Sequence, residues 1–356
     1  MPVLYRTYRP SKWSEVIGQD HITEPLKDSI ANKRIAHAYL FSGSRGIGKT
    51  TLARIFAKDV GANEEDIYEI DAASNRGIDD IRSLREHVSV LPFSSAYKVY
   101  IIDEVHMLSK DAWNALLKTL EEPPAHVIFI LATTELDKVP ETIISRCQTF
   151  VFRKPSREVI RKQVQAISKK EGIEVDAGAA DLIALLGDGS FRDALGMLEK
   201  VISSSSDLPA TPARAGQAGK KITRQEVEAI TGSPKAELVN KFIENLISKN
   251  GDAALAVLGE ALNQAISMAT FSTLVLEKTR FILLLQNSPA SKSQIEDRVS
   301  PDDWAFISTQ AGKKLVTAEM LTRLLEATDG VGRAKIESLP LELAVVSICG
   351  DTSLLR

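Results

Sequence analysis

The first part of the chain alternates short apolar runs with segments of helical periodicity. The runs are rich in branched and aromatic residues and cover positions 38–41, 67–70, 99–102, 127–131 and 150–152. Apolar runs of this kind are typical of strands in a parallel sheet that is buried on both faces, and the amphipathic segments between them supply the covering helices. The pattern therefore predicts an α/β domain over residues 1–155.

Beyond Pro155 the strand pattern stops and the spacing of apolar residues becomes helical. The helical segments are 156–170, 176–186 and 191–202. Together they predict a small helical domain over residues 156–232. Residues 203–221, which are rich in Ser, Ala, Pro and Gly, predict a flexible insertion within it.

The last part of the chain, residues 233–356, predicts an all-helical domain. One apolar stripe at helical spacing consists of Leu238, Val239, Phe242, Ile243, Leu246 and Ile247. Similar stripes recur to about Ile348. Periodicity does not distinguish a bundle that buries its own core from an oligomerisation collar, so both interpretations stay open.

The overall composition is that of an ordinary folded protein. Of the 356 residues, 44% are hydrophobic and 26% are charged, values that exclude a wholly disordered chain. Lys and Arg number 44 against 47 Asp and Glu, which gives a formal net charge of −3. Because positive charge is not in excess, any contact with DNA has to be a local patch.

The two cysteines, Cys147 and Cys349, are too few for a four-cysteine zinc site and poorly suited to a disulfide framework. The sequence also has no apolar run long enough to span a membrane and no signal-peptide core at its N-terminus. We therefore expect a cytoplasmic protein without a membrane partner.

A complete phosphate-loop pattern follows the first apolar run. Positions 43–50 read Gly-Ser-Arg-Gly-Ile-Gly-Lys-Thr, and a helical segment follows directly. Glycines let backbone N–H groups converge on phosphates, Lys49 reaches the β- and γ-phosphates, and the Thr50 hydroxyl can hold Mg²⁺. The strand and helix on either side disfavour a chance glycine-rich turn. The candidate nucleotide-binding residues of this loop are Gly43, Ser44, Arg45, Gly46, Ile47, Gly48, Lys49, Thr50 and Thr51.

Two adjacent carboxylates follow the apolar run 99–102. The first, Asp103, lies 54 residues after Lys49. A carboxylate at the carboxyl end of a neighbouring strand can bind Mg²⁺, and the next one can polarise the attacking water. We assign these two roles to Asp103 and Glu104, with capping of the strand end as the alternative. His106 is expected to be structural rather than catalytic.

Polar residues also follow the next apolar run, where Thr133 and Thr134 stand. A hydroxyl at this strand end would contact the γ-phosphate or the attacking water, and we favour Thr133 over Thr134. Helix capping is the alternative role. Further along, Arg146 and Arg192 could each stabilise charge on a transferring phosphoryl group, although an isolated arginine is usually a solvated surface residue.

Several stretches resemble the clamp-loader members of the AAA+ ATPases. They are Leu-Tyr-Arg-Thr-Tyr-Arg-Pro at 4–10, Val-Ile-Gly-Gln at 16–19, Asp-Glu-Val-His at 103–106, the run ending in Leu-Glu-Glu-Pro-Pro at 114–124, and Ser-Arg-Cys at 145–147. Glu-Ile-Asp-Ala-Ala-Ser at 69–74 and Gly-Ser-Phe-Arg-Asp-Ala-Leu at 189–195 resemble more specifically the gamma/tau subunits of the bacterial DNA polymerase III clamp loader. The resemblance is dense up to residue 198 and thin after residue 220.

The resemblance implies an ATPase that uses ATP and Mg²⁺. It implies that Arg192, in a helical lid domain, senses nucleotide in cis, and that Arg146 is an arginine finger for the ATP of a neighbouring subunit. The last domain would be the collar that joins five subunits into an open ring. The residues implied to surround adenine are Tyr8, Arg9, Pro10, Val16, Ile17 and Gly18.

The resemblance further implies that the ring opens a sliding clamp and loads it on primer-template DNA during replication. Arg76 and Arg82 lie where such a subunit could contact the DNA backbone, although they could equally be ordinary solvated charges. Family members usually carry a four-cysteine zinc module after the phosphate-loop helix, whereas residues 58–66 contain no cysteine. We therefore expect no zinc.

Two other functions stay open at this point. A hexameric AAA+ ATPase of branch migration or replication maintenance would form rings of six rather than five subunits. A non-hydrolysing structural subunit of the same loader is disfavoured by the intact Lys49, Thr50 and Asp103-Glu104 elements. No paired metal-binding carboxylates indicate a nucleotidyl-transfer site, so a polymerase label would belong to the holoenzyme.

Overall fold

A computed structural model of the chain describes residues 3–74, 87–204, 221–296 and 299–350. The chain divides into two compact units, Met1–Ile160 with Gly187–Gly196, and Arg161–Leu186 with Met197–Arg356. The division into domains at 1–155, 156–232 and 233–356 stays a prediction. Within the described ranges, no helix is long and apolar enough to cross a membrane.

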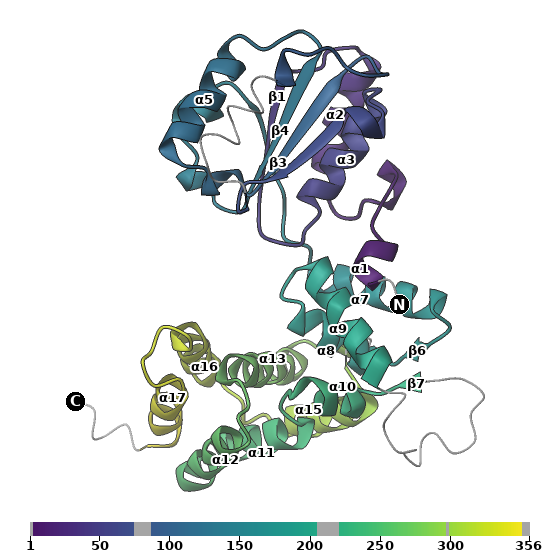
Figure 1. Cartoon of the computed structure of the whole chain (residues 1–356). Coiled ribbons are helices and arrows are strands. Elements are labelled where there is room, and N and C mark those ends of the chain that lie inside the picture. Colours follow the sequence, from purple (N-terminus) through teal and green to yellow (C-terminus); the bar gives the residue numbers. More distant parts are fainter. Residues whose placement is uncertain (1–2, 75–86, 205–220, 297–298, 351–356) are drawn as a thin grey trace. The chain divides into compact units, whose positions relative to one another are not determined.

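The first unit contains a five-stranded parallel sheet in the order β2-β3-β4-β1-β5 (Figure 1). Its strands are β1 Ala38–Ser42, β2 Ile67–Asp71, β3 Lys98–Asp103, β4 Val127–Thr133 and β5 Gln148–Val151. The α/β prediction is therefore confirmed. The last strand, predicted at 150–152, starts two residues earlier and ends one residue earlier. It starts earlier because this edge strand begins with the exposed polar residues Gln148 and Thr149. An apolar run does not mark such a start.

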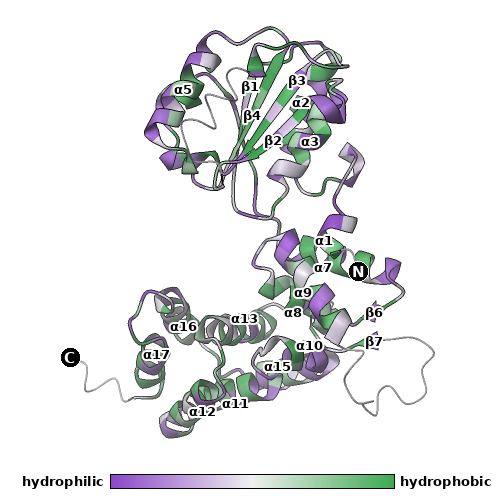
Figure 2. Ribbon diagram, viewed as in Figure 1, coloured by the Kyte–Doolittle hydropathy of each residue, from purple (hydrophilic) through white to green (hydrophobic). Residues whose placement is uncertain are grey.

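Alternate side chains of the central strands face opposite sides of the sheet. Tyr39 and Phe41 pack against α2 (Asp20–Ala31) and α3 (Lys49–Asp59), whereas Leu40 packs against α5 (Lys110–Glu121). Figure 1 shows α2 and α3 on one side of the sheet and α5 on the other. The central strands are accordingly apolar along their length (Figure 2), as a sheet covered on both faces requires.

Short elements complete this unit. Among the residues that the structure describes, the remaining helices that lie in it or begin in it are α1 Leu4–Thr7, α6 Glu141–Ile144, α7 Arg157–Lys170 and α9 Phe191–Ser204. Its 3-10 helices are η1 Trp13–Glu15, η2 Glu64–Asp66, η3 Val105–Met107 and η4 Leu136–Lys138. Helices α7 and α9 continue into the second unit.

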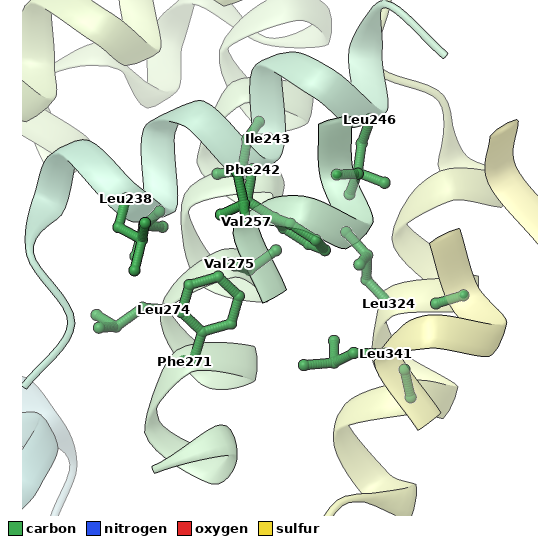
Figure 3. Packing of buried hydrophobic residues seen from close by; sticks show 14 of the residues in the cluster. Leu238, Phe242, Ile243, Leu246, Val257, Phe271, Leu274, Val275, Leu324 and Leu341 are labelled. Carbon is green, nitrogen blue, oxygen red and sulfur yellow. The ribbon is translucent and has the colours of Figure 1, made fainter. Parts of the chain in front are cut away.

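The second unit is built mainly from helices, and those from α11 to α17 share an apolar core. The helices are α8 Ala177–Leu186, α10 Arg224–Thr231, α11 Ala236–Ile247, α12 Gly251–Asn263, α13 Met268–Asn287, α14 Lys292–Glu296, α15 Pro301–Lys313, α16 Ala318–Gly330 and α17 Leu339–Cys349, with the 3-10 helix η6 Pro289–Ser291. Figure 3 shows Phe242 of α11 among residues from the neighbouring helices, including Phe271 of α13 and Leu341 of α17. The predicted helical character of this part is confirmed.

Two short strands in this unit were not predicted. β6 (Glu174–Val175) pairs in parallel with β7 (Lys221–Ile222). Each strand has only two residues, which is too short for an alternation of apolar and polar positions to be visible in the sequence.

A cluster of charged side chains is buried in the second unit. Asp303 of α15 accepts hydrogen bonds from Arg224 Nη1 and Lys278 Nζ, each at 2.5 Å. Arg224 Nε also donates to Glu228 Oε1 at 2.9 Å, and Lys278 Nζ donates to Asn240 Oδ1 at 2.6 Å. Burial acts to raise the pKa of Asp303, but Lys278 and Arg224 outweigh it and leave that pKa below its ordinary value. The carboxylate is therefore charged and fully paired.

Asp303→Asn should destabilise this unit strongly. The substitution leaves two buried cations without their shared counter-ion, a loss that costs about 3–5 kcal/mol in comparable buried pairs. Urea unfolding followed by far-UV circular dichroism measures the change. The control is Asp302→Asn at the exposed neighbouring position, which should cost less than about 1 kcal/mol. Equal stability of both variants would contradict this account of the cluster.

Candidate nucleotide-binding site

The phosphate loop connects the end of β1 to the start of α3, and its glycines are required by its backbone. Gly43, Gly46 and Gly48 have φ of +148°, +75° and +104°, in the region that residues with a side chain rarely adopt. A Cβ on Gly43 would lie 2.7 Å from Ile47 Cδ1, and one on Gly46 would collide with Ser190 Oγ. The sequence pattern therefore corresponds to a formed loop at the N-terminus of a helix, an arrangement that suits anionic phosphates.

Lys49 is held directly beneath this loop. Its side chain is buried, and Nζ donates to the backbone oxygens of Gly43 at 2.7 Å and Ser44 at 3.0 Å. Burial lowers the pKa of Lys49, while the nearby Glu104 and Asp103 carboxylates act to raise it. A buried ammonium that bonds two carbonyl oxygens can exchange them for phosphate oxygens without a large movement of the side chain.

Thr50 and Asp103 meet although they lie 53 residues apart in the sequence. Thr50 Oγ1 donates to Asp103 Oδ2 at 2.7 Å. The contact forms because β3, which ends at Asp103, is separated from β1 only by β4, so the carboxyl ends of these strands share one edge of the sheet. A hydroxyl and a carboxylate are oxygen ligands of the kind that Mg²⁺ prefers, so the pair fits that ion.

Glu104 follows Asp103 in a left-handed conformation, with φ of +48°. Its N–H donates to Asp103 Oδ1 at 3.0 Å, and its carboxylate accepts a hydrogen bond from Thr134 Oγ1 at 3.0 Å. A side-chain-bearing residue with positive φ is costly unless its surroundings enforce it, and such residues concentrate at functional sites. The carboxylate is thereby turned toward the end of β4.

The two candidate threonines at the end of β4 have different neighbours. Thr133 is fully buried, and its Oγ1 lies 3.0 Å from His106 Nδ1 and accepts from the Glu135 N–H at 3.0 Å. Thr134, the residue that the sequence ranked second, is the one whose hydroxyl bonds Glu104. His106 Nε2 also lies 3.2 Å from Glu135 Oε1. The Thr133 hydroxyl therefore faces His106, whereas the Thr134 hydroxyl bonds the Glu104 carboxylate.

The residues expected around adenine lie on the segment between α1 and α2. Arg9 Nε donates to Thr51 Oγ1 at 3.0 Å, which joins this segment to the first turn of α3. Burial lowers the pKa of Arg9, as do Arg54 and Arg192, while Glu69 and Asp103 oppose the change. The remaining members of the set are the half-buried Tyr8, Pro10 and Val16, the exposed Ile17, and Gly18, which has a φ of +74°.

Arg192 lies in the first turn of α9, next to the phosphate loop. The Phe191 N–H donates to the Gly46 carbonyl at 3.1 Å, so the start of α9 contacts the loop directly. The guanidinium of Arg192 lies 5.9 Å from the centre of the Tyr5 ring, within cation–π range. This exposed arginine is therefore close to the loop that would hold the phosphates.

Arg146 has its neighbours elsewhere in the first unit. Its guanidinium bonds the Thr142 carbonyl and the Glu121 carboxylate rather than the phosphate loop, judged over the residues that the structure describes. The candidate DNA-contacting residues Arg76 and Arg82 lie outside those residues. Within the same limits, no group of three His, Cys, Asp or Glu side chains forms a metal-ligand cluster.

Two family models match the chain. Residues 18–75 and 61–156 match the DNA polymerase III delta subunit family, and residues 159–207 match the ATPase lid domain of the DNA polymerase III clamp loader subunit. The matches cover the sheet unit and the helices that follow it.

Curated relatives match over most of this chain. DNA polymerase III subunit tau of Bacillus subtilis is 38% identical over 97% of this chain and 63% of its own length. The gamma/tau subunit of Mycobacterium bovis is 35% identical over 95% of this chain and 60% of its own length. The chain thus spans less than two thirds of these relatives.

Solved structures agree on the fold. The RuvB Holliday junction branch migration motor of Thermotoga maritima superposes with a TM-score of 0.51 at 20% identity, over 72% of this chain and 88% of that chain. Together with the phosphate loop and the parallel sheet, these matches define a P-loop nucleoside triphosphatase of the AAA+ class with a lid domain. The identities with the curated relatives show which family within this class it is: the chain belongs to the gamma/tau family of DNA polymerase III clamp-loader subunits.

Proposed function

We propose that the chain is an ATP-hydrolysing motor subunit of a clamp loader, which opens a sliding clamp and loads it on primer-template DNA. The observation that carries the proposal is the convergence of Lys49, the Thr50–Asp103 pair and Glu104 at one edge of the sheet. Membership of the gamma/tau family favours the clamp loader over other AAA+ machines.

Each of these residues would have a separate task. Lys49 and the loop N–H groups would bind the phosphates, and Thr50 and Asp103 would hold Mg²⁺, which offsets the charge of the transferring phosphoryl group. Glu104 would polarise the attacking water, and the hydroxyl of Thr133 or Thr134 would contact the γ-phosphate or that water. Arg192 would sense the phosphates in cis, and Arg146 would reach the ATP of a neighbouring subunit. Tyr8, Arg9, Pro10, Val16, Ile17 and Gly18 would surround the adenine.

The experiment that tests this proposal is a steady-state ATPase assay on the ring assembled with its partner subunits. Clamp and primed DNA together should stimulate hydrolysis far more than either alone, since a loader couples hydrolysis to both. A hydrolysis rate that is the same with and without the clamp would contradict the proposal.

The alternative is a hexameric branch-migration ATPase, the class to which the structurally similar RuvB motor belongs. At 20% identity that likeness reports the shared fold alone. Native mass spectrometry of the assembled ring would separate the two, since a clamp loader should contain five subunits and a branch-migration motor six. A polymerase activity is not part of the proposal, and the cytoplasmic location stays a prediction.

Helix α17 supports the expectation that the chain joins a ring. Leu339, Leu343 and Val346 recur at helical spacing and are 38%, 60% and 55% exposed. An apolar stripe on the surface of a helix is costly in water and suits a protein partner, which here would be the adjacent loader subunit.

Replacing Leu343 and Val346 by Asp should therefore weaken ring assembly at least about tenfold, because burying one such side chain contributes roughly 1.5–3 kcal/mol. Analytical ultracentrifugation of the mixed subunits measures the assembly. The double variant Thr309→Asp with Thr322→Asp, which adds the same two charges at exposed positions of α15 and α16, is the control and should assemble normally. Equal assembly of both variants would remove α17 from the interface.

The protein should not bind stoichiometric zinc. Residues 58–66 lack cysteine, and Cys147 is a half-buried thiol whose pKa is raised to about 12 by desolvation, which makes it a poor ligand. Elemental analysis of the tag-free protein checks this, and one zinc ion per chain would contradict it.

A further inference from the structure

Arg146 is held by its own chain through three hydrogen bonds. Its Nη1 donates to the Thr142 carbonyl at 2.7 Å and to Ser145 Oγ at 3.4 Å, and its Nη2 donates to Glu121 Oε1 at 2.9 Å. Thr142 belongs to α6, whereas Glu121 is the last residue of α5, so the two anchors come from different helices. The proposed function gives a task to Arg146 and none to Glu121.

The contact between Glu121 and Arg146 contributes little to stability. The side chains are 44% and 36% exposed, and ion pairs at such positions typically contribute about 0–1 kcal/mol. Its main physical effect is geometric, because an arginine side chain alone samples many rotamers. Two hydrogen bonds to separate helices fix both the position and the plane of the guanidinium. Arginine has five N–H donors, so donors remain for a phosphate.

We propose that Glu121 is a positioning residue, which holds the Arg146 guanidinium in the orientation that it needs to meet the γ-phosphate of a neighbouring subunit. This inference rests on the proposed function of Arg146. Glu121 acts only through the arginine, so its contribution belongs to the neighbour's reaction and not to ATP binding by its own chain. Replacing the Glu121 carboxylate by a neutral amide removes the charge that strengthens this hydrogen bond, so the guanidinium leaves its productive orientation in a fraction of encounters.

The test compares Glu121→Gln with Glu122→Gln in the ring assembled with its partner subunits. Glu122 is the exposed next residue and provides a matched change of charge. Glu121→Gln should lower the stimulated kcat about tenfold, within the range that misplacement of a reacting group costs, and leave KM for ATP unchanged. Glu122→Gln should leave both constants at the wild-type value.

A second measurement separates positioning from a general structural defect. Glu121→Gln is combined with Lys49→Ala in one subunit, so that this subunit hydrolyses nothing itself, and the ring is compared with one carrying Lys49→Ala alone. The additional loss should appear in the neighbour's hydrolysis. In an Arg146→Ala background, Glu121→Gln should cause no further loss, since it acts through that arginine.

Three results would overturn the inference. They are a wild-type kcat for Glu121→Gln, a raised kcat, which would mean that Glu121 restrains the arginine, and a further loss in the Arg146→Ala background. These results are distinguishable from a failure of the proposed function. If Arg146→Ala itself retains stimulated hydrolysis, the finger role fails and the inference fails with it. If Arg146→Ala is inactive and Glu121→Gln is normal, only the inference fails.

Discussion

Arg146→Ala should reduce the clamp- and DNA-stimulated ATP hydrolysis of the assembled ring by a factor of about 10³, while ATP affinity stays within a few-fold of normal. Hydrolysis concentrates negative charge on the γ-phosphoryl oxygens, and a guanidinium supplied by a neighbour contributes about 10³ to 10⁵ in rate in other phosphoryl-transfer enzymes. Arg146 bonds residues of α5 and α6 and not the phosphate loop of its own chain, as a residue that acts on a neighbouring subunit should.

Mixing mutants in one ring shows whether this arginine acts between subunits. Lys49→Ala should abolish ATP binding in its own subunit, because it removes the buried ammonium beneath the loop. A ring that mixes Lys49→Ala and Arg146→Ala subunits should regain some hydrolysis, at interfaces where an intact Arg146 faces an intact loop. If both variants assemble and mixing never restores hydrolysis, the assignment in trans is wrong.

Glu104→Gln should slow hydrolysis at least about a hundredfold without loss of ATP binding. The carboxylate is the expected general base, and such groups contribute typically 10²–10⁴ in rate. Glutamine keeps an oxygen that can accept the hydrogen bond from Thr134, so the geometry of the strand end should survive while the charge is lost. ATP binding and single-turnover hydrolysis in the assembled ring measure the two effects separately.

The contrast with Lys49→Ala is the control for Glu104→Gln, because the lysine variant should fail at binding and the glutamine variant only at hydrolysis. A near-normal turnover of Glu104→Gln would transfer the role of base to another residue.

The central part of the site could be predicted from the sequence because parallel strands determine it. Once the run 99–102 is recognised as a strand of the same sheet, Asp103 has to emerge near the loop that follows β1, and the Thr50–Asp103 hydrogen bond confirms this meeting. The glycine spacing likewise predicted a loop whose backbone only glycine adopts readily, as the positive φ of Gly46 and Gly48 shows.

The choice between Thr133 and Thr134 could not be made in the same way. All seven residues of β4 are buried, so no alternation of polar and apolar positions indicates which side chain faces which side. These contacts form only in the folded protein, where the Thr133 hydroxyl lies against His106 and the Thr134 hydroxyl bonds Glu104.

Contacts between distant polar residues were missed for a related reason. Glu121 ends helix α5 and Arg146 lies 25 residues later in the turn after α6, while Arg224 and Asp303 lie 79 residues apart. Helical periodicity assigns isolated charged residues to the solvent-facing side, so it gives no signal that Arg224, Lys278 and Asp303 pair inside a core.

The most direct test of the central claim is transfer of a sliding clamp to primed circular DNA, measured by separating DNA-bound clamp from free clamp by gel filtration. The ring assembled with this chain and its partner subunits should load the clamp in the presence of ATP, and the ring with Lys49→Ala should not. Transfer that is equal with and without ATP, or a complete lack of transfer by a ring that hydrolyses ATP, would contradict the assignment of this chain as the motor of a clamp loader.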